Sequence, residues 1–138
     1  MTRRQTLKLA SWFLGLALGA GFGNAIGQQA APTENKGVTV KVLTAVDLGP
    51  EIEGMGGRQL RMRMLAIDPG GVVGMHGHKD RPATDYMLQG SVIDHRGSVA
   101  KEYGPGDTFF EDKNTMHWLE NKGTTPAVFI SVDVFKQP

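Results

Sequence analysis

Two histidines separated by one residue, His76 and His78, lie in a glycine-bounded segment (residues 70–90, GGVVGMHGHKDRPATDYMLQG) and limit what this chain can form. The surrounding residues alternate as in a β-strand, where residues i and i+2 project from the same face, so both imidazoles project together. Neutral imidazoles held side by side are typical ligands of zinc, copper, iron and nickel. The alternative is a pair of surface or hydrogen-bonded core histidines. The pattern predicts two arms of a metal site, with His117 as the candidate third arm.

The spacing around these histidines resembles the cupin family, whose two motifs are G(x)5HxH(x)3–4E(x)6G and G(x)5PxG(x)2H(x)3N. The resemblance covers residues 38–135 of this chain. The matching positions are Gly70, His76, His78 and Gly90 in the first motif, and Gly106, His117 and Asn121 in the second.

Three positions depart from the family motifs. Ala83 stands where the first motif has its glutamate, and an alanine cannot ligate a metal. Asp112 and Asn114 replace the proline and the glycine of the second motif, and both residue types are common in turns. We therefore expect the turn to be kept and the glutamate ligand to be lost.

The resemblance implies an all-β fold, a single cupin β-barrel of the double-stranded β-helix or jelly-roll type. It also implies that His76, His78 and His117 hold a divalent metal ion, which the sequence does not identify among iron, manganese, nickel and zinc. Composition independently favours such a fold, because 19 glycines and seven prolines separate about eight or nine short strand-like runs. After the N-terminal region, no long segment has helical periodicity.

Charge and cysteine content exclude several classes of partner and site. The net charge is +1, so there is no electrostatic reason to expect a nucleic acid partner. Cysteine is absent, which excludes disulfides, a thiolate metal site and a lipid-modified N-terminal cysteine. The expected partner is a small molecule.

Residues 1–27 are predicted to be an export signal. Arg3 and Arg4 lie in the sequence TRRQTLK, which resembles the twin-arginine signal with Thr6 at the usual phenylalanine position. An apolar, glycine-rich run follows, and small residues precede Gln28, as at a cleavage site. A retained membrane anchor is the alternative. We expect cleavage, no stable membrane anchor afterwards, and a periplasmic or secreted protein.

The mature chain is expected to divide into a flexible polar leader, residues 28–37, and the barrel domain, residues 38–138. Within the barrel, residues 59–67 alternate, with Leu60, Met62 and Met64 on one face. We expect this apolar face to enter the barrel or to form the interface of a homodimer.

Arg61 and Arg63 lie on the opposite face of the same segment. They are either solvated surface residues or, in the functional interpretation, one of them lines the cavity and binds a carboxylate through its bidentate fork. Arg58 and Arg81 are weaker candidates of the same kind.

Asp85 follows Ala83 on the same face of the next predicted strand, about 6.5 Å further along. Because it is farther from the histidines and shorter than glutamate, we expect it to face a substrate or support a ligand instead of binding the metal. Asp85 and Arg63 are therefore the candidate catalytic residues. His95 is placed at an exposed hairpin turn, away from the metal.

These features favour an exported metalloenzyme with three histidine ligands, an oxygenase-like protein acting on a small oxygen-rich organic compound. Two alternatives remain: a non-catalytic module that binds a small ligand, and a barrel in which the metal mainly adds stability. Three histidines without a fourth protein ligand favour an open metal site, which argues against the purely structural role.

Overall fold

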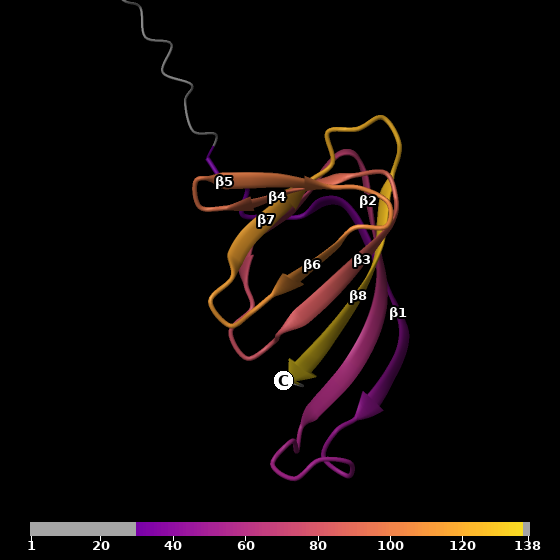
Figure 1. Ribbon diagram of the computed structural model, residues 1–138, viewed down its shortest axis with the longest axis vertical. Helices are drawn as coiled ribbons and strands as arrows, with labels where there is room; N and C mark the ends of the chain where they lie inside the picture. The colour runs from indigo at the N-terminus through magenta and orange to yellow at the C-terminus, as the bar shows by residue number, and fades with distance from the viewer. Residues whose placement is uncertain (1–29, 137–138) are drawn as a thin grey trace, which may run out of the picture.

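Eight β-strands and no helix make up residues 30–136, the part of the chain that the computed structural model describes (Figure 1). This part therefore contains no helix that could cross a membrane. The predicted export signal lies outside the described residues. The strands are β1 (Lys36–Asp47), β2 (Arg58–Gly77), β3 (Ala83–Gln89), β4 (Val92–Arg96), β5 (Val99–Tyr103), β6 (Thr108–Glu111), β7 (Met116–Glu120) and β8 (Ala127–Lys136).

All strand pairs are antiparallel, and the strand order is β5-β4-β7-β2-β8-β3-β6, with β1 added along β2. Figure 1 shows the strands curling around a common interior. The all-β, single-barrel prediction of the double-stranded β-helix type is confirmed.

Strand β2 belongs to both halves of the barrel because its neighbouring strands change midway along its length. Residues 58–67 pair with β8 and with most of β1, whereas residues 72–77 pair with β7, and Val72 also meets Lys36 at the start of β1. Between the two parts lies Gly70, with φ of +72°, a backbone conformation that side chains with a Cβ rarely adopt. The turn there carries the strand from one half of the barrel to the other, and the second half contains His76.

The inward side chains of β8 change from apolar to polar along the strand. Phe129 belongs to the core and borders the cavity described below, Ser131 also lines that cavity, and Asp133 is equally buried beyond it. One end of the barrel is thus a packed hydrophobic core and the other a polar chamber. The core consists of Leu65, Ile67, Met87, Val92, Phe109, Leu119, Ala127 and Phe129.

The expectation that Leu60, Met62 and Met64 enter the barrel is wrong. Leu60 and Met62 are 42% and 39% exposed, whereas Arg61 and Arg63 point inward. The inward arginines are compatible with the barrel because both form ion pairs with the fully buried carboxylate of Asp133. The dimer interface, the other expectation for this face, is not tested by the fold.

Part of the predicted flexible leader is held against β2. The N–H of Met75 donates to the carbonyl of Pro32 at 2.7 Å, and the N–H of Gly74 donates to the side chain of Asn35 at 2.9 Å. A Cβ on Gly74 would lie 2.7 Å from the backbone of Thr33, so the close approach requires glycine at this position. Residues 32–35 therefore form a cover strip beside the histidine-bearing half of β2.

Candidate metal centre

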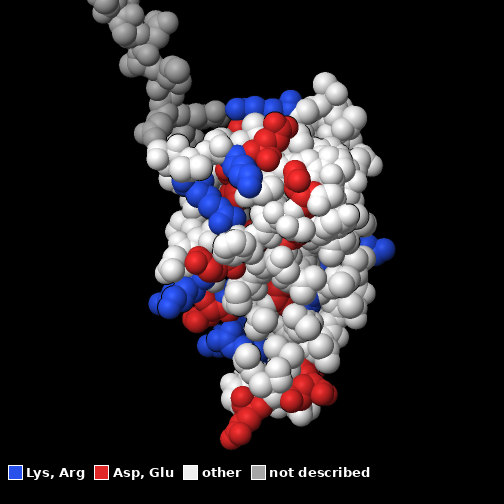
Figure 2. Space-filling model, viewed as in Figure 1, with Lys and Arg blue, Asp and Glu red and all other residues white. Residues whose placement is uncertain are grey.

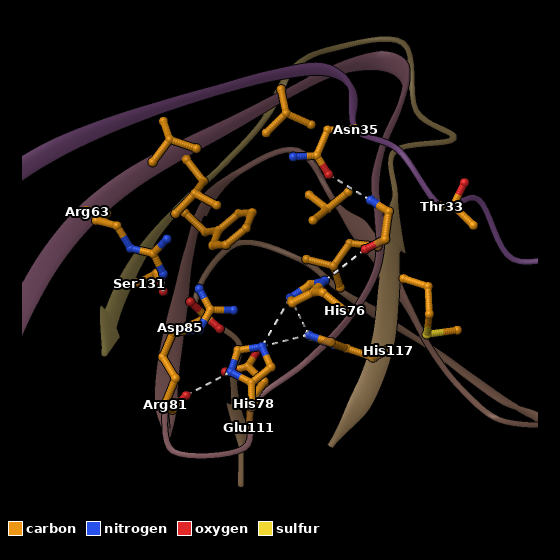
Figure 3. Close-up of a pocket in the computed structure, with 18 residues that line it drawn as sticks. Thr33, Asn35, Arg63, His76, His78, Arg81, Asp85, Glu111, His117 and Ser131 are labelled. Carbon is orange, nitrogen blue, oxygen red and sulfur yellow. Dashed lines mark hydrogen bonds between the residues drawn. The ribbon is translucent and has the colours of Figure 1, made fainter. Parts of the chain in front are cut away.

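The structure brings together the three histidines that the sequence predicted as metal ligands (Figure 3). His76 lies on β2, His78 directly follows it, and His117 lies opposite His76 in the β2–β7 register. The Nε2 atoms of all three rings are 3.1 Å from one another. The three rings thus converge on one point at the polar end of the barrel.

The second ring nitrogen of each histidine shows which nitrogen carries the proton. Nδ1 of His76 lies 2.8 Å from the Gly74 carbonyl, and Nδ1 of His78 lies 3.0 Å from the Arg81 carbonyl. A carbonyl oxygen only accepts, so each Nδ1 must donate and each Nε2 presents a lone pair. Such outer hydrogen bonds commonly fix the tautomer of metal-binding histidines.

His117 is oriented by a carboxylate instead of a carbonyl. Its Nδ1 donates to Asp94 on β4 at 2.9 Å, and Arg96 donates to the other oxygen of Asp94 at 2.8 Å. Burial alone would raise the pKa of Asp94, but these hydrogen bonds and charges outweigh it, and the pKa is lowered. Asp94 is therefore an acceptor, and the sequence analysis missed its role because nothing in VIDHR indicates a contact with His117.

Three lone pairs aimed at one point would repel unless a cation lies between them. Desolvation lowers the pKa of His76 and lowers that of His78 to about 4, so both rings are neutral near pH 7. Metal–nitrogen bonds of about 2.0–2.1 Å, as for zinc, give nitrogen–nitrogen separations close to those in the cluster. The donor set, its protonation and its spacing fit a divalent metal ion.

His95, which was expected to stand apart from the metal, lies outside the cluster. It is not at the tip of the hairpin, however. Its ring stacks on Trp118 with centroids 3.8 Å apart, and its Nε2 lies 2.7 Å from Glu120. Pairing between β4 and β7 places His95 opposite Trp118, which explains the stack.

Beside the histidines lies a cavity of about 310 Å³. Apolar side chains such as Leu65, Leu119 and Phe129 line one part of it, and charged groups line another. The cover strip contributes two residues, Thr33 and Asn35. A chamber of this size, next to a candidate metal centre, has room for a small organic molecule.

Arg63 lies in the wall of this cavity, as the functional interpretation predicted. Its terminal nitrogen donates to Ser131 at 3.0 Å and lies 3.1 Å from the carboxylate of Asp133. Its Nε is buried without a hydrogen-bond partner. Burial lowers the pKa of Arg63, with Asp133 opposing, yet a guanidinium stays charged in a protein. One N–H of Arg63 is therefore available for a ligand.

The other arginine candidates have different positions. Arg61 forms a two-bond fork on Asp133, at 3.1 and 2.8 Å, and its guanidinium lies over the ring of Phe135. Arg58 donates to a backbone carbonyl at the surface. Arg81 lines the cavity, 4.0 Å from Asp133. Arg61 thus anchors the buried carboxylate, while Arg63 and Arg81 border the space for a ligand.

Asp85 is buried in the cavity wall and lies outside the histidine cluster. Next to it is Glu111 on β6, which the sequence analysis did not consider. Glu111 is paired across the strands with Ala83, the position of the family's glutamate. The alternation of TFFE, which puts Phe109 and Glu111 on one face, was the available signal. The cavity therefore contains two carboxyl groups, neither of them at the expected ligand position.

The cupin domain model matches residues 63–133, about half of the chain, and the chain belongs to this family. An oxalate-binding protein of Thermotoga maritima is 31% identical over 68 residues, which are 49% of this chain and 56% of that protein. The match thus spans little more than half the length of this curated relative.

Solved structures share the fold. A predicted oxalate decarboxylase from Thermotoga maritima has a TM-score of 0.58 at 21% identity, covering 77% of this chain and 94% of its own. A polyketide cyclase from Streptomyces resistomycificus has a TM-score of 0.61 at 20% identity, covering 78% and 71%. At these identities the similarity supports the architecture alone.

Proposed function

We propose that this cupin binds one divalent metal ion through His76, His78 and His117 and acts on a small oxygen-rich organic compound held in the adjoining cavity. The reaction we propose is of the oxygenase type. The observation that carries the proposal is the convergence of three Nε2 lone pairs, each fixed by a hydrogen bond at Nδ1. Such a set leaves positions on the ion for a substrate, since it contributes only three ligands.

When bound, the ion would supply Lewis acidity and, as iron, manganese or nickel, a means of activating dioxygen, both atoms of which enter the product of a dioxygenase. The protein's own part is to hold and orient the substrate. Arg63 offers its free N–H to an anionic oxygen, and Asp85 lies on the same wall. The apolar side chains of the cavity exclude water from the remainder of the ligand.

A second candidate is a module that binds its ligand without transforming it. The observation that favours it is the similarity to a protein whose name states that it binds oxalate. Oxalate is a small anion with adjacent oxygens, and both the histidine set and Arg63 suit such a molecule. Oxalate is therefore a useful probe for either function.

Export to the periplasm or secretion is part of the proposal. It is supported by the paired arginines of TRRQTLK and by the apolar run that follows. N-terminal sequencing of the protein from its native host should give a chain beginning at Gln28. A chain that retains residues 1–27 would support the membrane-anchor alternative.

The deciding experiment is elemental analysis of the mature protein, followed by oxygen-uptake assays with diketones and flavonoids and a binding titration with oxalate. Iron, manganese or nickel at about one ion per chain, with oxygen uptake, is the expected result. Zinc with oxalate binding but no turnover would favour the binding module. Absence of metal from protein isolated by the native export route would overturn the metal assignment.

A further inference from the structure

Two acidic side chains from neighbouring strands lie together in the wall of the cavity. Asp85 on β3 and Glu111 on β6 are 4% and 3% exposed, and both border the cavity. The register pairs Asp85 with Phe109 and Ala83 with Glu111, so the two acids are diagonal neighbours on the inner face. Figure 3 shows them on the side of the cavity toward Arg81 and His78.

The hydrogen bonding of this wall is incomplete if both acids are ionised. Among the described residues, the buried side-chain atoms that lack a partner are Arg63 Nε, Asp85 Oδ1 and Glu111 Oε2. All three residues border the same cavity. Two of the three atoms are carboxyl oxygens from groups within hydrogen-bonding reach of each other. One proton between these carboxyl groups would satisfy both oxygens and remove the repulsion of two buried charges.

The surroundings of Glu111 favour the proton. Burial, then the hydrogen bond and charge of Asp85, raise the pKa of Glu111 to about 9. Burial also raises the pKa of Asp85, although hydrogen bonds from Glu111 and Ser131 oppose it. The charged or titratable groups that act on the pair most strongly from other strands are Arg63 on β2, Asp94 and Arg96 on β4, and His117 on β7. Asp133 on β8 is buried opposite Ala83 and is itself ion-paired with Arg61 and Arg63, and Arg81 borders the same cavity.

A shared proton changes the ligand that the cavity accepts. With one proton the acid pair carries one negative charge, which Arg63 and Arg81 on the same wall can balance. With no proton, two negative charges would face any ligand anion. When a ligand binds, the Glu111 O–H can turn from Asp85 to a ligand oxygen, and together with the free N–H of Arg63 on the same cavity it gives two donors for the oxygens of a carboxylate or an enolate.

We infer that Asp85 and Glu111 share one proton and that, with the Arg63 Nε–H, they form a subsite for the anionic oxygens of a small carboxylic acid. This inference rests on the proposed function, since the other end of the ligand would meet the ion held by the histidines. Bound there, the ligand oxygen accepts a hydrogen bond from the pair. It can also accept the proton itself, which breaks the O–H bond at Glu111, forms one at the ligand and leaves Glu111 a carboxylate.

The first test is spectroscopic and does not depend on activity. Infrared spectra of the metal-loaded protein at neutral pH should contain the C=O band of a protonated carboxyl group. The band should disappear in Glu111→Gln and remain in Glu102→Gln, a control in which the replaced acid is exposed on β5. Absence of the band from the native protein, or its persistence in Glu111→Gln, would overturn the shared proton.

The second test is calorimetric titration of the metal-loaded protein with oxalate between neutral pH and about pH 10. The native protein should bind with constant affinity up to the pKa of the pair and about tenfold more weakly for each pH unit above it. Glu111→Gln, which stays neutral, should bind within about threefold of the native protein at neutral pH and lose less affinity at high pH. Ionisation of water on the ion would weaken binding equally in both proteins, so the difference between the profiles isolates Glu111.

Arg63→Met should weaken oxalate binding about tenfold while leaving the infrared band in place. Identical pH profiles for the native protein and Glu111→Gln, or a metal-loaded protein that does not bind oxalate, would overturn the subsite. The two proposals can fail separately. Absence of metal in elemental analysis would count against the proposed function, whereas absence of the infrared band would count against the shared proton.

Discussion

The three histidines of the candidate centre differ in what holds their outer nitrogen. Backbone carbonyls accept from His76 and His78, whereas the Asp94 carboxylate accepts from His117. A carboxylate makes the ring it holds a stronger electron donor toward a metal than a carbonyl does. His117 should therefore contribute more than an equal share of the affinity for the ion.

Replacing a converging histidine should remove most of the bound metal. We expect His76→Ala and His117→Ala to lower metal content severely, because two nitrogen ligands seldom retain a divalent ion. His95→Ala is the matched control, since His95 stacks on Trp118 and lies outside the cluster. Elemental analysis after dialysis measures the effect. Equal metal loss from His95→Ala would contradict the assignment of ligands.

Glu111 should make folding stability depend on pH in a defined direction. Its pKa rises from 4.5 to about 9 on folding, so between these values the folded state binds one proton more than the unfolded state. Glu111 thus raises the free energy of unfolding at low pH, and this contribution is lost as the pH rises through this window. Glu111→Gln removes the dependence.

The melting temperature of Glu111→Gln, relative to the native protein, should therefore be higher at about pH 8.5 than at about pH 5, by about 4 °C or more. Differential scanning calorimetry at the two pH values measures this difference. Glu102→Gln should show no such trend. A relative melting temperature that is the same at both pH values would mean that Glu111 titrates normally in the folded state.

At the scale of strands, the histidine spacing and the glycine positions predicted the barrel and the convergence of the three rings. Periodicity identified the two faces of β2 but not which face is inside. Counting apolar residues favoured Leu60 and Met62. The structure places Arg61 and Arg63 inward, where both form ion pairs with Asp133, seventy-two positions from Arg61. A pairing between residues so distant in the chain has no local signal.

Glu111 and Asp94 were missed for the same reason. Each becomes part of the site through a neighbouring strand: Glu111 through β3 and Asp94 through β7. The contacts of a single strand can be inferred from alternation, whereas the choice of neighbour depends on the whole sheet order. The family motif identified the three histidines because its spacing reflects the sheet order that brings them together in proteins with this fold.

The cover strip depends on the absence of a side chain at residue 74. Gly74→Ala would place a Cβ 2.7 Å from the backbone of Thr33, so residues 32–35 must move away from β2. We expect a loss of about 1–3 kcal/mol in the free energy of unfolding and faster proteolysis near Thr33. Chemical denaturation and limited proteolysis measure the two effects.

Gly56→Ala is the control, because a Cβ on Gly56 would meet nothing within 4 Å. It should leave both measurements close to those of the native protein. If Gly74→Ala is equally harmless, the cover strip is not fixed by its contact with β2.

At the scale of the molecule, charge and apolar surface are distributed differently. Figure 2 shows basic and acidic side chains interspersed on one face, without a broad area of one sign.

An outer sheet face, by contrast, carries apolar residues on β2 and β8. Leu60 stands opposite Val134, and Met62 opposite Val132, with both β2 residues substantially exposed. Two copies of this chain can pack these apolar side chains together, and we propose the expected homodimer there.

Met62→Glu should convert that homodimer to a monomer, because two copies of the glutamate would be buried near each other in a symmetric interface. Val99→Glu is the control: Val99 is 64% exposed on β5, at a different part of the barrel. Size-exclusion chromatography with light scattering measures the mass. A native protein that is monomeric at micromolar concentration, or a dimer unaffected by Met62→Glu, would contradict this interface.

The first and last parts of the described chain meet at the cavity, since Thr33 and Asn35 precede β1 and Ser131 belongs to β8. Because β8 lies between β2 and β3 in the sheet, the chamber cannot close before the final strand has been synthesised. A chain synthesised only as far as β7 contains all three histidines but not their enclosure. Assembly of the site therefore follows synthesis of β8, and the cellular compartment in which the chain then folds decides which ions it meets.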